Sequence, residues 1–317
     1  MKVIEHLERS KGRPLISYEV IPPKRGGSID LLFNVLNDVI KYDPPFIDVT
    51  SRAAEVEYIE TEGGIKKKVL RKRPGTISIS AAIKNHFNID AVPHLLCYGF
   101  TREETEDALI ELNYLGIENV LAIRGDDLGY HKPIPGHKSQ NKFAYQLVEQ
   151  IVNMNKGKYL EDELLDAAPT DFCIGIGGYP EVHFEAPNLK VEVERVKQKV
   201  NAGAHFVVTQ MFYENKFYFD FVKKCRDEGI TIPIIPGLKI LTTRDHLSTI
   251  PKNFYITIPE ELSSEVMEAK DGHVTEIGAR WAAKQAEDLL NNGAPSLHFY
   301  IMQSAKPIIK MFSYLKM

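Results

Sequence analysis

The sequence has little cysteine and no long apolar run, and each shortage excludes a class of protein. Its three cysteines, Cys97, Cys173 and Cys225, are far apart and form no Cys-x-x-Cys pair, which argues against a zinc site or a disulfide framework. Cys225 shares a helical register with Phe217 and Phe221, as expected of a core thiol. Without 18 consecutive apolar residues the sequence predicts no membrane helix, and we expect no membrane partner.

An excess of positive charge is also missing. The 39 Lys and Arg residues against 43 Asp and Glu give a net charge of −4, which leaves no basic surface for a phosphate backbone. Nucleic acid is therefore a poor candidate partner, and small molecules are favoured. Residues 1–10 carry charges where a signal peptide needs an apolar stretch, so we expect a cytoplasmic protein.

Short apolar runs alternate with amphipathic helical patterns along the 317 residues. The runs predict eight strands, at residues 15–21, 46–50, 89–97, 121–123, 172–176, 206–210, 232–235 and 297–301. Eight strands alternating with helices predict a (β/α)₈ TIM barrel, an α/β fold, as a single domain over residues 1–317. A doubly wound open sheet is the alternative.

Two segments interrupt this alternation. Residues 51–75 are polar and basic, and residues 127–140 are rich in glycine and proline. We expect both to be excursions or loops outside the core. Elsewhere the helices have clear signals: Thr101 and Glu104 form a capping box, and a long helix is expected over residues 274–291 with Trp281 facing inward. Phe143, Leu147 and Ile151 mark another helix.

The active site of a (β/α)₈ barrel lies at the carboxyl ends of its strands, so the residues that end the strands should form one ring. They are Glu19, Thr50, His94, Arg124, Asp126, Tyr179, Gln210 and Gly237. Carboxylates, a histidine, hydroxyls and an amide suit proton transfer and the binding of a flat, hydrogen-bonding ligand. No metal is expected, because His94 has no further strong ligand at a zinc spacing.

Two carboxylates of this ring have alternative interpretations. Glu19 follows Tyr18 and precedes Val20, so burial should disfavour its ionised form and leave it protonated, able to act as an acid. If its side chain points out of the barrel, it is inert. Asp126 is either a functional carboxylate or a turn residue.

Phosphate-binding signals are partial. Gly175-x-Gly177-Gly178 is not a dinucleotide fingerprint, because Pro180 stands where the third glycine belongs, but it allows a backbone to approach a ligand closely. Glu192, Arg195 and Lys199 recur at spacings of three and four, on one face of a helix. This row is either a surface salt-bridge network or an anchor for a diphosphate and ribose.

Seven segments resemble, in order, the signature segments of the methylenetetrahydrofolate reductase family. They are Tyr-Glu-Val-Ile-Pro-Pro at 18–23, Pro-His-Leu at 93–95, Ala-Ile-Arg-Gly-Asp at 122–126, Gly-Tyr-Pro-Glu-Val-His at 178–183, Asn-Ala-Gly-Ala at 201–204, Val-Thr-Gln-Met-Phe at 208–212 and Ile-Ile-Pro-Gly at 234–237. The resemblance runs from about residue 15 to 300, and the fourth segment and the Arg-Gly-Asp strand end are the most specific.

The resemblance implies a barrel that holds FAD noncovalently without a Rossmann domain. NADH or NADPH reduces the flavin, leaves, and is replaced by 5,10-methylenetetrahydrofolate, which becomes 5-methyltetrahydrofolate in a ping-pong scheme. Glu19 is implied as the general acid that protonates the bridging nitrogen of the folate. Asp126 is implied near flavin and pterin, and Gln210 as a hydrogen-bonding partner of the folate.

Further positions match those around FAD in the family: Thr50, His94, Arg124, Gly125, Asp126, Gly178, Tyr179, His183, Glu192, Arg195, Lys199 and Ala204. The chain departs from the family after Thr50, where Ser51 and Arg52 replace a Tyr-Gly-Ala-Gly-like turn. It also lacks the aromatic residue that relatives carry after Ile-Pro-Gly, which leaves Phe212 or Tyr213 as candidates for stacking on substrate. The resemblance further implies a homo-oligomer, and we expect no regulatory domain.

Two other functions remain open at this point. A pterin-binding methyltransferase barrel shares a folate pocket but needs no flavin. A ligand-binding barrel without chemistry is the non-enzymatic alternative, and the intact Glu19, Asp126 and Gln210 count against it.

Overall fold

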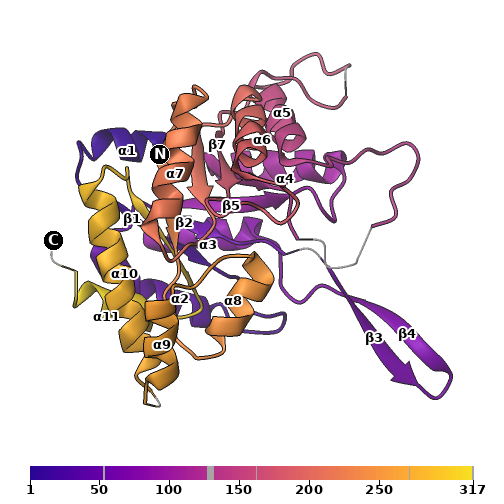
Figure 1. The fold of residues 1–317 in the computed structure, drawn as a ribbon. Coiled ribbons are helices and arrows are strands. Elements are labelled where there is room, and N and C mark those ends of the chain that lie inside the picture. Colours follow the sequence, from indigo (N-terminus) through magenta and orange to yellow (C-terminus); the bar gives the residue numbers. More distant parts are fainter. Residues whose placement is uncertain (53, 127–131, 162, 271, 316–317) are drawn as a thin grey trace.

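The computed structural model describes residues 1–52, 54–126, 132–161, 163–270 and 272–315. Its main sheet is entirely parallel, with the strand order β10-β11-β1-β2-β5-β6-β7-β8-β9. The end strands β9 (Ile234–Ile235) and β10 (Gly237–Leu238) flank Pro236, which has no N–H to donate to the ladder. They therefore occupy one strand position, with β9 paired to β8 and β10 to β11, and the sheet closes into the predicted eight-position barrel (Figure 1).

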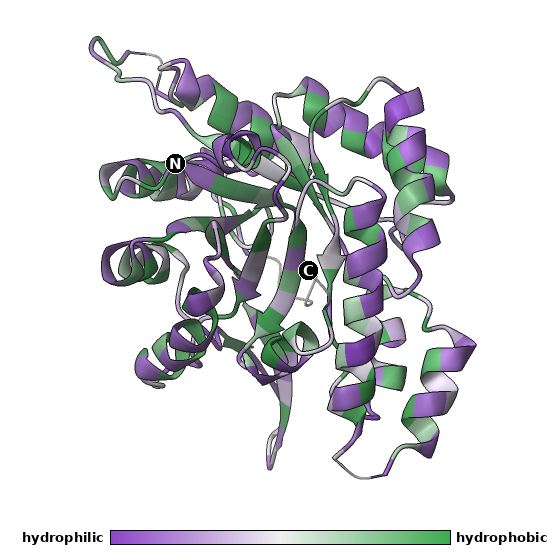
Figure 2. Ribbon diagram, turned by 90° about the vertical axis from the view of Figure 1, so that its left-hand side faces the viewer, coloured by the Kyte–Doolittle hydropathy of each residue, from purple (hydrophilic) through white to green (hydrophobic). Residues whose placement is uncertain are grey.

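The other barrel strands coincide with the apolar runs to within a few residues. They are β1 (Ile16–Val20), β2 (Phe46–Val49), β5 (Asp90–Leu96), β6 (Asn119–Ile123), β7 (Cys173–Gly178), β8 (Phe206–Thr209) and β11 (Leu297–Met302). They are largely buried, because helices cover the outside of the barrel and side chains fill its interior. Figure 2 shows this as mainly apolar strands surrounded by helices of alternating hydropathy.

The helices are α1 (Val3–Arg9), α2 (Asp30–Val39), α3 (Ile77–Phe87), α4 (Arg102–Tyr114), α5 (Ala144–Asn155), α6 (Leu189–Asn201), α7 (Asn215–Asp227), α8 (His246–Phe254), α9 (Glu260–Glu268), α10 (Val274–Asn291) and α11 (Lys306–Phe312), with a 3₁₀ turn η1 (Ile40–Tyr42). The predicted capping box is present: Glu104 N donates to Thr101 Oγ1 at 3.2 Å, and Thr101 N to Glu104 Oε2 at 2.9 Å. Trp281 is half-buried on α10 and donates to the backbone oxygen of Tyr213.

The amino-terminal helix closes one end of the barrel. Val3 of α1 is fully buried among residues at the starts of the strands, including Phe46 and Cys173, and its N–H donates to Asn119 Oδ1 at 2.8 Å. The carboxyl ends of the strands are thus the end available for a site.

A hairpin of β3 (Glu55–Thr61) and β4 (Gly64–Leu70) projects from the body of the molecule, within the expected excursion 51–75 (Figure 1). Residues 132–140 contain no helix or strand, and 127–131, the rest of the second expected loop, lie outside the described residues. Among the helices of the described chain, none has the length and apolarity needed to cross a membrane.

Gly278 marks the closest approach of a helix to a loop. A Cβ added there would lie 2.1 Å from the backbone oxygen of Leu241. Although Gly→Ala inside a helix normally stabilises by about 1 kcal/mol, we expect Gly278→Ala to lower the free energy of unfolding by about 1–3 kcal/mol, because α10 must shift. Urea denaturation measures this, with Gly63→Ala as control, since nothing lies within 4 Å of a Cβ at that turn. A Gly278→Ala protein as stable as wild type contradicts the packing.

Candidate active site

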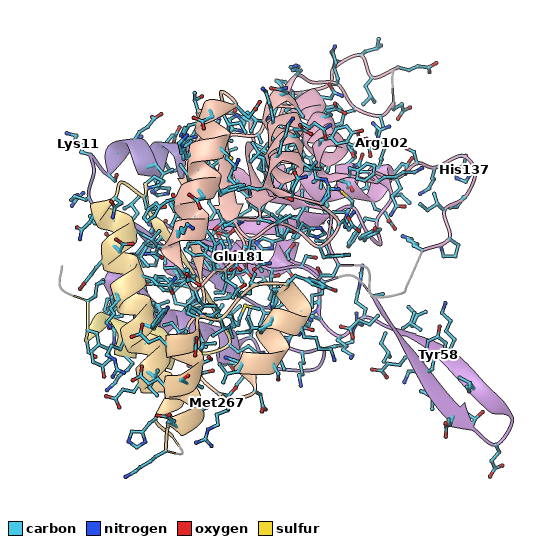
Figure 3. All side chains as sticks on the ribbon, in the orientation of Figure 1. Lys11, Tyr58, Arg102, His137, Glu181 and Met267 are labelled. Atoms are coloured by element: carbon cyan, nitrogen blue, oxygen red, sulfur yellow. The ribbon has the colours of Figure 1, made fainter. Side chains whose placement is uncertain are left out.

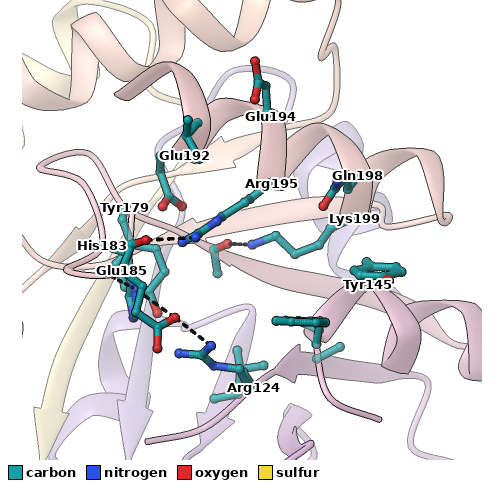
Figure 4. A pocket seen from close by; sticks show the side chains of 16 residues that line it. Arg124, Tyr145, Tyr179, His183, Glu185, Glu192, Glu194, Arg195, Gln198 and Lys199 are labelled. Atoms are coloured by element: carbon teal, nitrogen blue, oxygen red, sulfur yellow. Dashed lines mark hydrogen bonds and ion pairs between the residues drawn. The ribbon is translucent and has the colours of Figure 1, made fainter. Parts of the chain in front are cut away.

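Two adjoining cavities lie at the carboxyl ends of the strands. The first, of about 500 Å³, lies between α5, α6 and the ends of β6 and β7 (Figure 4). The second, of about 260 Å³, lies over the mouth of the barrel. They share part of their walls: Ile123, Arg124, Gly177, Tyr179 and His183. A ligand of dinucleotide length can therefore extend from one into the other.

The structure brings the ring of strand-end residues together except for Gly237, which is buried in β10 and lines neither cavity. The second cavity is lined by Glu19, Thr50, His94, Arg124, Gly125, Asp126, Gly178, Tyr179, His183 and Gln210. The first is lined by Arg124, Tyr179, His183, Glu192, Arg195 and Lys199. Of the residues expected around FAD, Ala204 lines neither cavity: it is buried in the core, and its N–H donates to the backbone oxygen of Lys199 at 3.2 Å.

Glu19 points into the barrel mouth, where buried side chains surround its carboxylate. Oε2 lies 3.6 Å from Nε2 of His94 and 4.0 Å from Nε2 of His298. His94 Nε2 also lies 3.4 Å from Asp48 Oδ2. The alternative in which Glu19 faces outward is therefore wrong.

The ionisation expected of Glu19 is also wrong for the ligand-free protein. Burial alone would raise the pKa of Glu19, but the charges of His94, His298 and Lys239 lower it below its ordinary value. Burial works against the charge on His94 too, yet Glu19 and Asp48 raise the pKa of that imidazole. Each of the two groups thus shifts the pKa of the other in the direction that favours a carboxylate beside a protonated imidazole.

The row on α6 faces the first cavity, so it is not a surface salt-bridge network. Lys199 Nζ donates to the backbone oxygen of Gly177 at 2.5 Å, and burial lowers the pKa of this lysine to about 8. Glu192 is 2% exposed, and its Oε2 has no hydrogen-bonding partner in the described part of the chain. Arg195 extends over the same cavity in Figure 4 and donates to the backbone oxygen of Glu185 at 3.0 Å.

Arg124 lines the first cavity together with the α6 row and pairs with an acidic side chain there. Its guanidinium forms a 2.7 Å ion pair with Glu185, which raises the pKa of the arginine (Figure 4). Three cationic side chains, Arg124, Arg195 and Lys199, thus surround one cavity. In the described residues no group of three or more His, Cys, Asp and Glu side chains is placed to hold a metal ion.

Sequence reasoning missed several polar residues of the site. Lys239, which lies beyond β10, and Tyr300 of β11 both line the second cavity, and Tyr300 donates from its hydroxyl to the backbone oxygen of Thr209 at 2.6 Å. Because side chains alternate along a strand, His298 and Tyr300 share the interior face, and the Leu-His-Phe-Tyr pattern of 297–300 was the available signal.

The aromatic residues expected to stack on the substrate also lie elsewhere. Phe212 and Tyr213 are 0% and 2% exposed and lie in core clusters, so neither is free to stack on a ligand. Besides Tyr179 and Tyr300, the mouth is lined by Phe254, at the end of α8. Phe143, grouped with Leu147 and Ile151 on a helix face, is instead the N-cap of α5, is 50% exposed and lines the first cavity. Ser51 and Arg52 line the mouth in place of the family's glycine-rich turn.

Comparison with solved structures shows the same fold at low identity. An uncharacterized protein from Clostridium thermocellum, which binds two copies of 5-methyl-5,6,7,8-tetrahydrofolic acid, superposes with a TM-score of 0.58 at 14% identity, covering 99% of this chain and 97% of that chain. An oxaloacetate acetylhydrolase gives 0.53 at 8% identity, covering 96% of this chain and 81% of its own.

Comparison with curated sequences is more specific. Methylenetetrahydrofolate reductase 2 of Saccharomyces cerevisiae is 30% identical over 318 residues, which cover 96% of this chain and 48% of that protein. The NADH-named reductase 1 of Arabidopsis thaliana is 29% identical, with 98% and 50% covered, so the chain spans about half the length of these relatives. The 5,10-methylenetetrahydrofolate reductase of Salmonella typhimurium is 27% identical, with 95% and 90% covered. Because the model of the family described as methylenetetrahydrofolate reductase matches residues 2–316, the chain belongs to that family.

Proposed function

We propose that this protein is a flavin-dependent methylenetetrahydrofolate reductase. It holds FAD noncovalently and converts 5,10-methylenetetrahydrofolate to 5-methyltetrahydrofolate with electrons from NADH or NADPH, in a ping-pong scheme through one pocket. The observation that supports this best is the join between the two cavities: a buried acid, Glu19, lies in one, and three cations surround the other.

The residues of the first cavity fit FAD. Arg124, Arg195 and Lys199 supply charge for a pyrophosphate. The unpartnered, buried Oε2 of Glu192 is an acceptor for a ribose hydroxyl. When bound, FAD would accept a hydride from the reduced nicotinamide and supply it to the folate.

The second cavity has the groups for the folate. Gln210 Oε1 accepts from the N–H of Met211 at 3.0 Å, which leaves its amide NH₂ free to donate to a ligand. Asp126 and Arg124 line the same cavity. Glu19 is buried, 8% exposed, beside His94.

Glu19 must carry a proton to act as an acid on the bridging nitrogen. A bound pterin excludes water from the mouth, and loss of solvation disfavours the ionised Glu19–His94 pair relative to the neutral pair. We therefore infer that the proton held at His94 Nε2 moves across the 3.6 Å gap to Glu19 Oε2 when the folate binds. Glu19 then donates it, which opens the five-membered ring of the folate.

Phe254 takes the stacking role that Phe212 and Tyr213 cannot. We expect Phe254→Ala to raise the KM for the folate about tenfold, because an aromatic contact is lost at the cavity mouth, with little change in FAD content. Steady-state kinetics measure this. Tyr255→Ala is the matched control, since that ring stacks on Phe184 and lines neither cavity. Equal effects of the two substitutions would exclude this role of Phe254.

The colour of the protein tests the proposed function against its alternatives. The purified protein is expected to be yellow or to take up added FAD with the shift of a bound flavin spectrum. Colourless protein that refuses FAD favours the pterin-binding methyltransferase. Bound FAD without any folate turnover favours the ligand-binding barrel.

A further inference from the structure

The hairpin of β3 and β4 carries one apolar face that the barrel does not cover. Paired residues of antiparallel strands point to the same side, so alternate pairs form one face. This face, called the hairpin face below, consists of the pairs Val56 with Val69, Tyr58 with Lys67, and Glu60 with Ile65. Tyr58 is 69% exposed, Ile65 72% and Val69 45%. Figure 3 shows Tyr58 on the projecting hairpin.

Polar contacts at its root, not the hairpin face, attach the hairpin to the barrel. Arg25, in the loop after β1, donates from its N–H to the backbone oxygen of Lys72 at 2.9 Å and from Nε to that of Arg71 at 3.1 Å. Lys72 pairs with Glu55 at 2.7 Å and with Glu57 at 3.2 Å. The arm is thereby oriented away from the body, and its apolar side chains remain in solvent.

A two-stranded hairpin is marginally stable in water, and three or more strands or a second packed layer stabilise it. We propose that the hairpin face is the contact surface for a second copy of this chain, whose own hairpin packs against it face to face about a two-fold axis. The two hairpins then form a small two-layer sandwich with the sheets about 10 Å apart. This proposal is independent of the proposed function.

Charge favours a second copy packed in this way. The hairpin face holds one acid, Glu60, and one base, Lys67, and neither forms a salt bridge within the described chain. A two-fold axis along the strands sets each β3 against the partner's β4. This places Tyr58 over the partner's Lys67, a cation–π contact, with Glu60 one cross-strand pair away from that ammonium group.

The alternative of edge-to-edge pairing is disfavoured by the same charges. β4 carries three consecutive lysines, Lys66, Lys67 and Lys68, whereas β3 carries Glu55, Glu57 and Glu60. A two-fold edge contact joins identical strands, so it would align lysines with lysines or glutamates with glutamates. Face-to-face packing avoids this repulsion.

The size of the hairpin face sets the expected affinity. It is smaller than the roughly 1,200–2,000 Å² of a stable interface, so we expect a dimer that dissociates in the micromolar range. Sedimentation velocity of the full chain with bound FAD, from about 0.1 to 100 µM, covers that range. The mass should double across the series. A wild-type protein that stays monomeric throughout overturns the proposal.

Single substitutions locate the contact. Tyr58→Glu is expected to weaken association at least 100-fold, because it replaces a central apolar group by an uncompensated charge. Tyr114→Glu is the control, since Tyr114 on α4 is 82% exposed but lies outside the hairpin. A Tyr58→Glu protein that associates like wild type, or an equal effect of Tyr114→Glu, overturns the assignment of this face.

Charge exchange tests whether the occupant is a second copy. Lys67→Glu and Glu60→Lys alone should each weaken association about tenfold, because every altered contact occurs twice in a two-fold dimer. The double variant regains one acid and one base on the face but not the cation–π contact, so it should associate more tightly than either single variant and more weakly than wild type. A double variant no better than either single variant overturns the two-fold contact, and FAD content of all variants checks that the barrel is folded.

Discussion

Glu19→Gln should reduce folate turnover by about 10³-fold while NADH or NADPH still bleaches the absorption of bound FAD. General acids contribute about 10²–10⁴ to rate, and the amide keeps the shape of the side chain but has no proton to give. The loss should be specific to Glu19 because of its position between two histidines. His94 and His298 lie 3.6 and 4.0 Å from its Oε2, and no other carboxylate among the described residues lies beside both. Single-turnover measurements of each half-reaction separate the two effects.

A matched control is available in Glu181. Its carboxylate is also largely buried, with burial raising its pKa, but it lines neither cavity and accepts a hydrogen bond from Thr257 N at 2.8 Å, which glutamine can also accept. Glu181→Gln should keep folate turnover within a few fold of wild type. Full folate turnover in Glu19→Gln removes this residue from the mechanism.

Lys199→Met should weaken FAD binding about 100-fold. Lys199 is a half-buried cation that lines the first cavity and donates to Gly177, and its loss leaves the pyrophosphate with two of its three cations. Lys197→Met is the control on the same helix, because Lys197 pairs with Glu228 at 3.1 Å away from the cavity. Fluorescence titration of the apoprotein with FAD measures both. Equal FAD affinities of the Lys199→Met and Lys197→Met proteins would mean that the α6 row has only a structural role.

The same lysine gives FAD binding a pH dependence. Burial lowers the pKa of Lys199 to about 8, so the ammonium form is complete well below that pH and is lost as the pH rises through it. FAD affinity should therefore be constant below about pH 7 and fall above about pH 8, with part of the loss delayed because a bound phosphate favours the charged lysine. Lys199→Arg should abolish this fall, since arginine stays charged.

Local patterns predicted the barrel and most of its ring. Apolar runs at the barrel strands and the pattern over 274–291 need only burial and helical period to be interpreted. The spacing of the α6 row predicted that its residues share one helix face, but not whether that face points to solvent or to a cavity. The structure shows that it lines the first cavity, with Glu192 buried.

The errors have different physical causes. The ionisation of Glu19 depends on His298 and Lys239, which lie more than 200 positions along the chain and meet it only when the barrel closes. Phe143 was predicted to mark a helix together with Leu147 and Ile151, but it is the N-cap residue and lies before the first helical turn. In the excursion 51–75 the lysine run indicated a solvated segment, and the alternation of Val56 and Tyr58 with glutamates in β3 was too short to predict the hairpin.

The most direct test of the proposed activity is an anaerobic two-step titration. The FAD-loaded protein is first reduced with NADH or NADPH, the oxidised nicotinamide is removed, and 5,10-methylenetetrahydrofolate is added without further reductant. The proposed function predicts that the flavin absorption returns in full, with one 5-methyltetrahydrofolate formed per flavin, identified by mass spectrometry. A flavin that stays reduced, or reoxidises without forming that product, would contradict it.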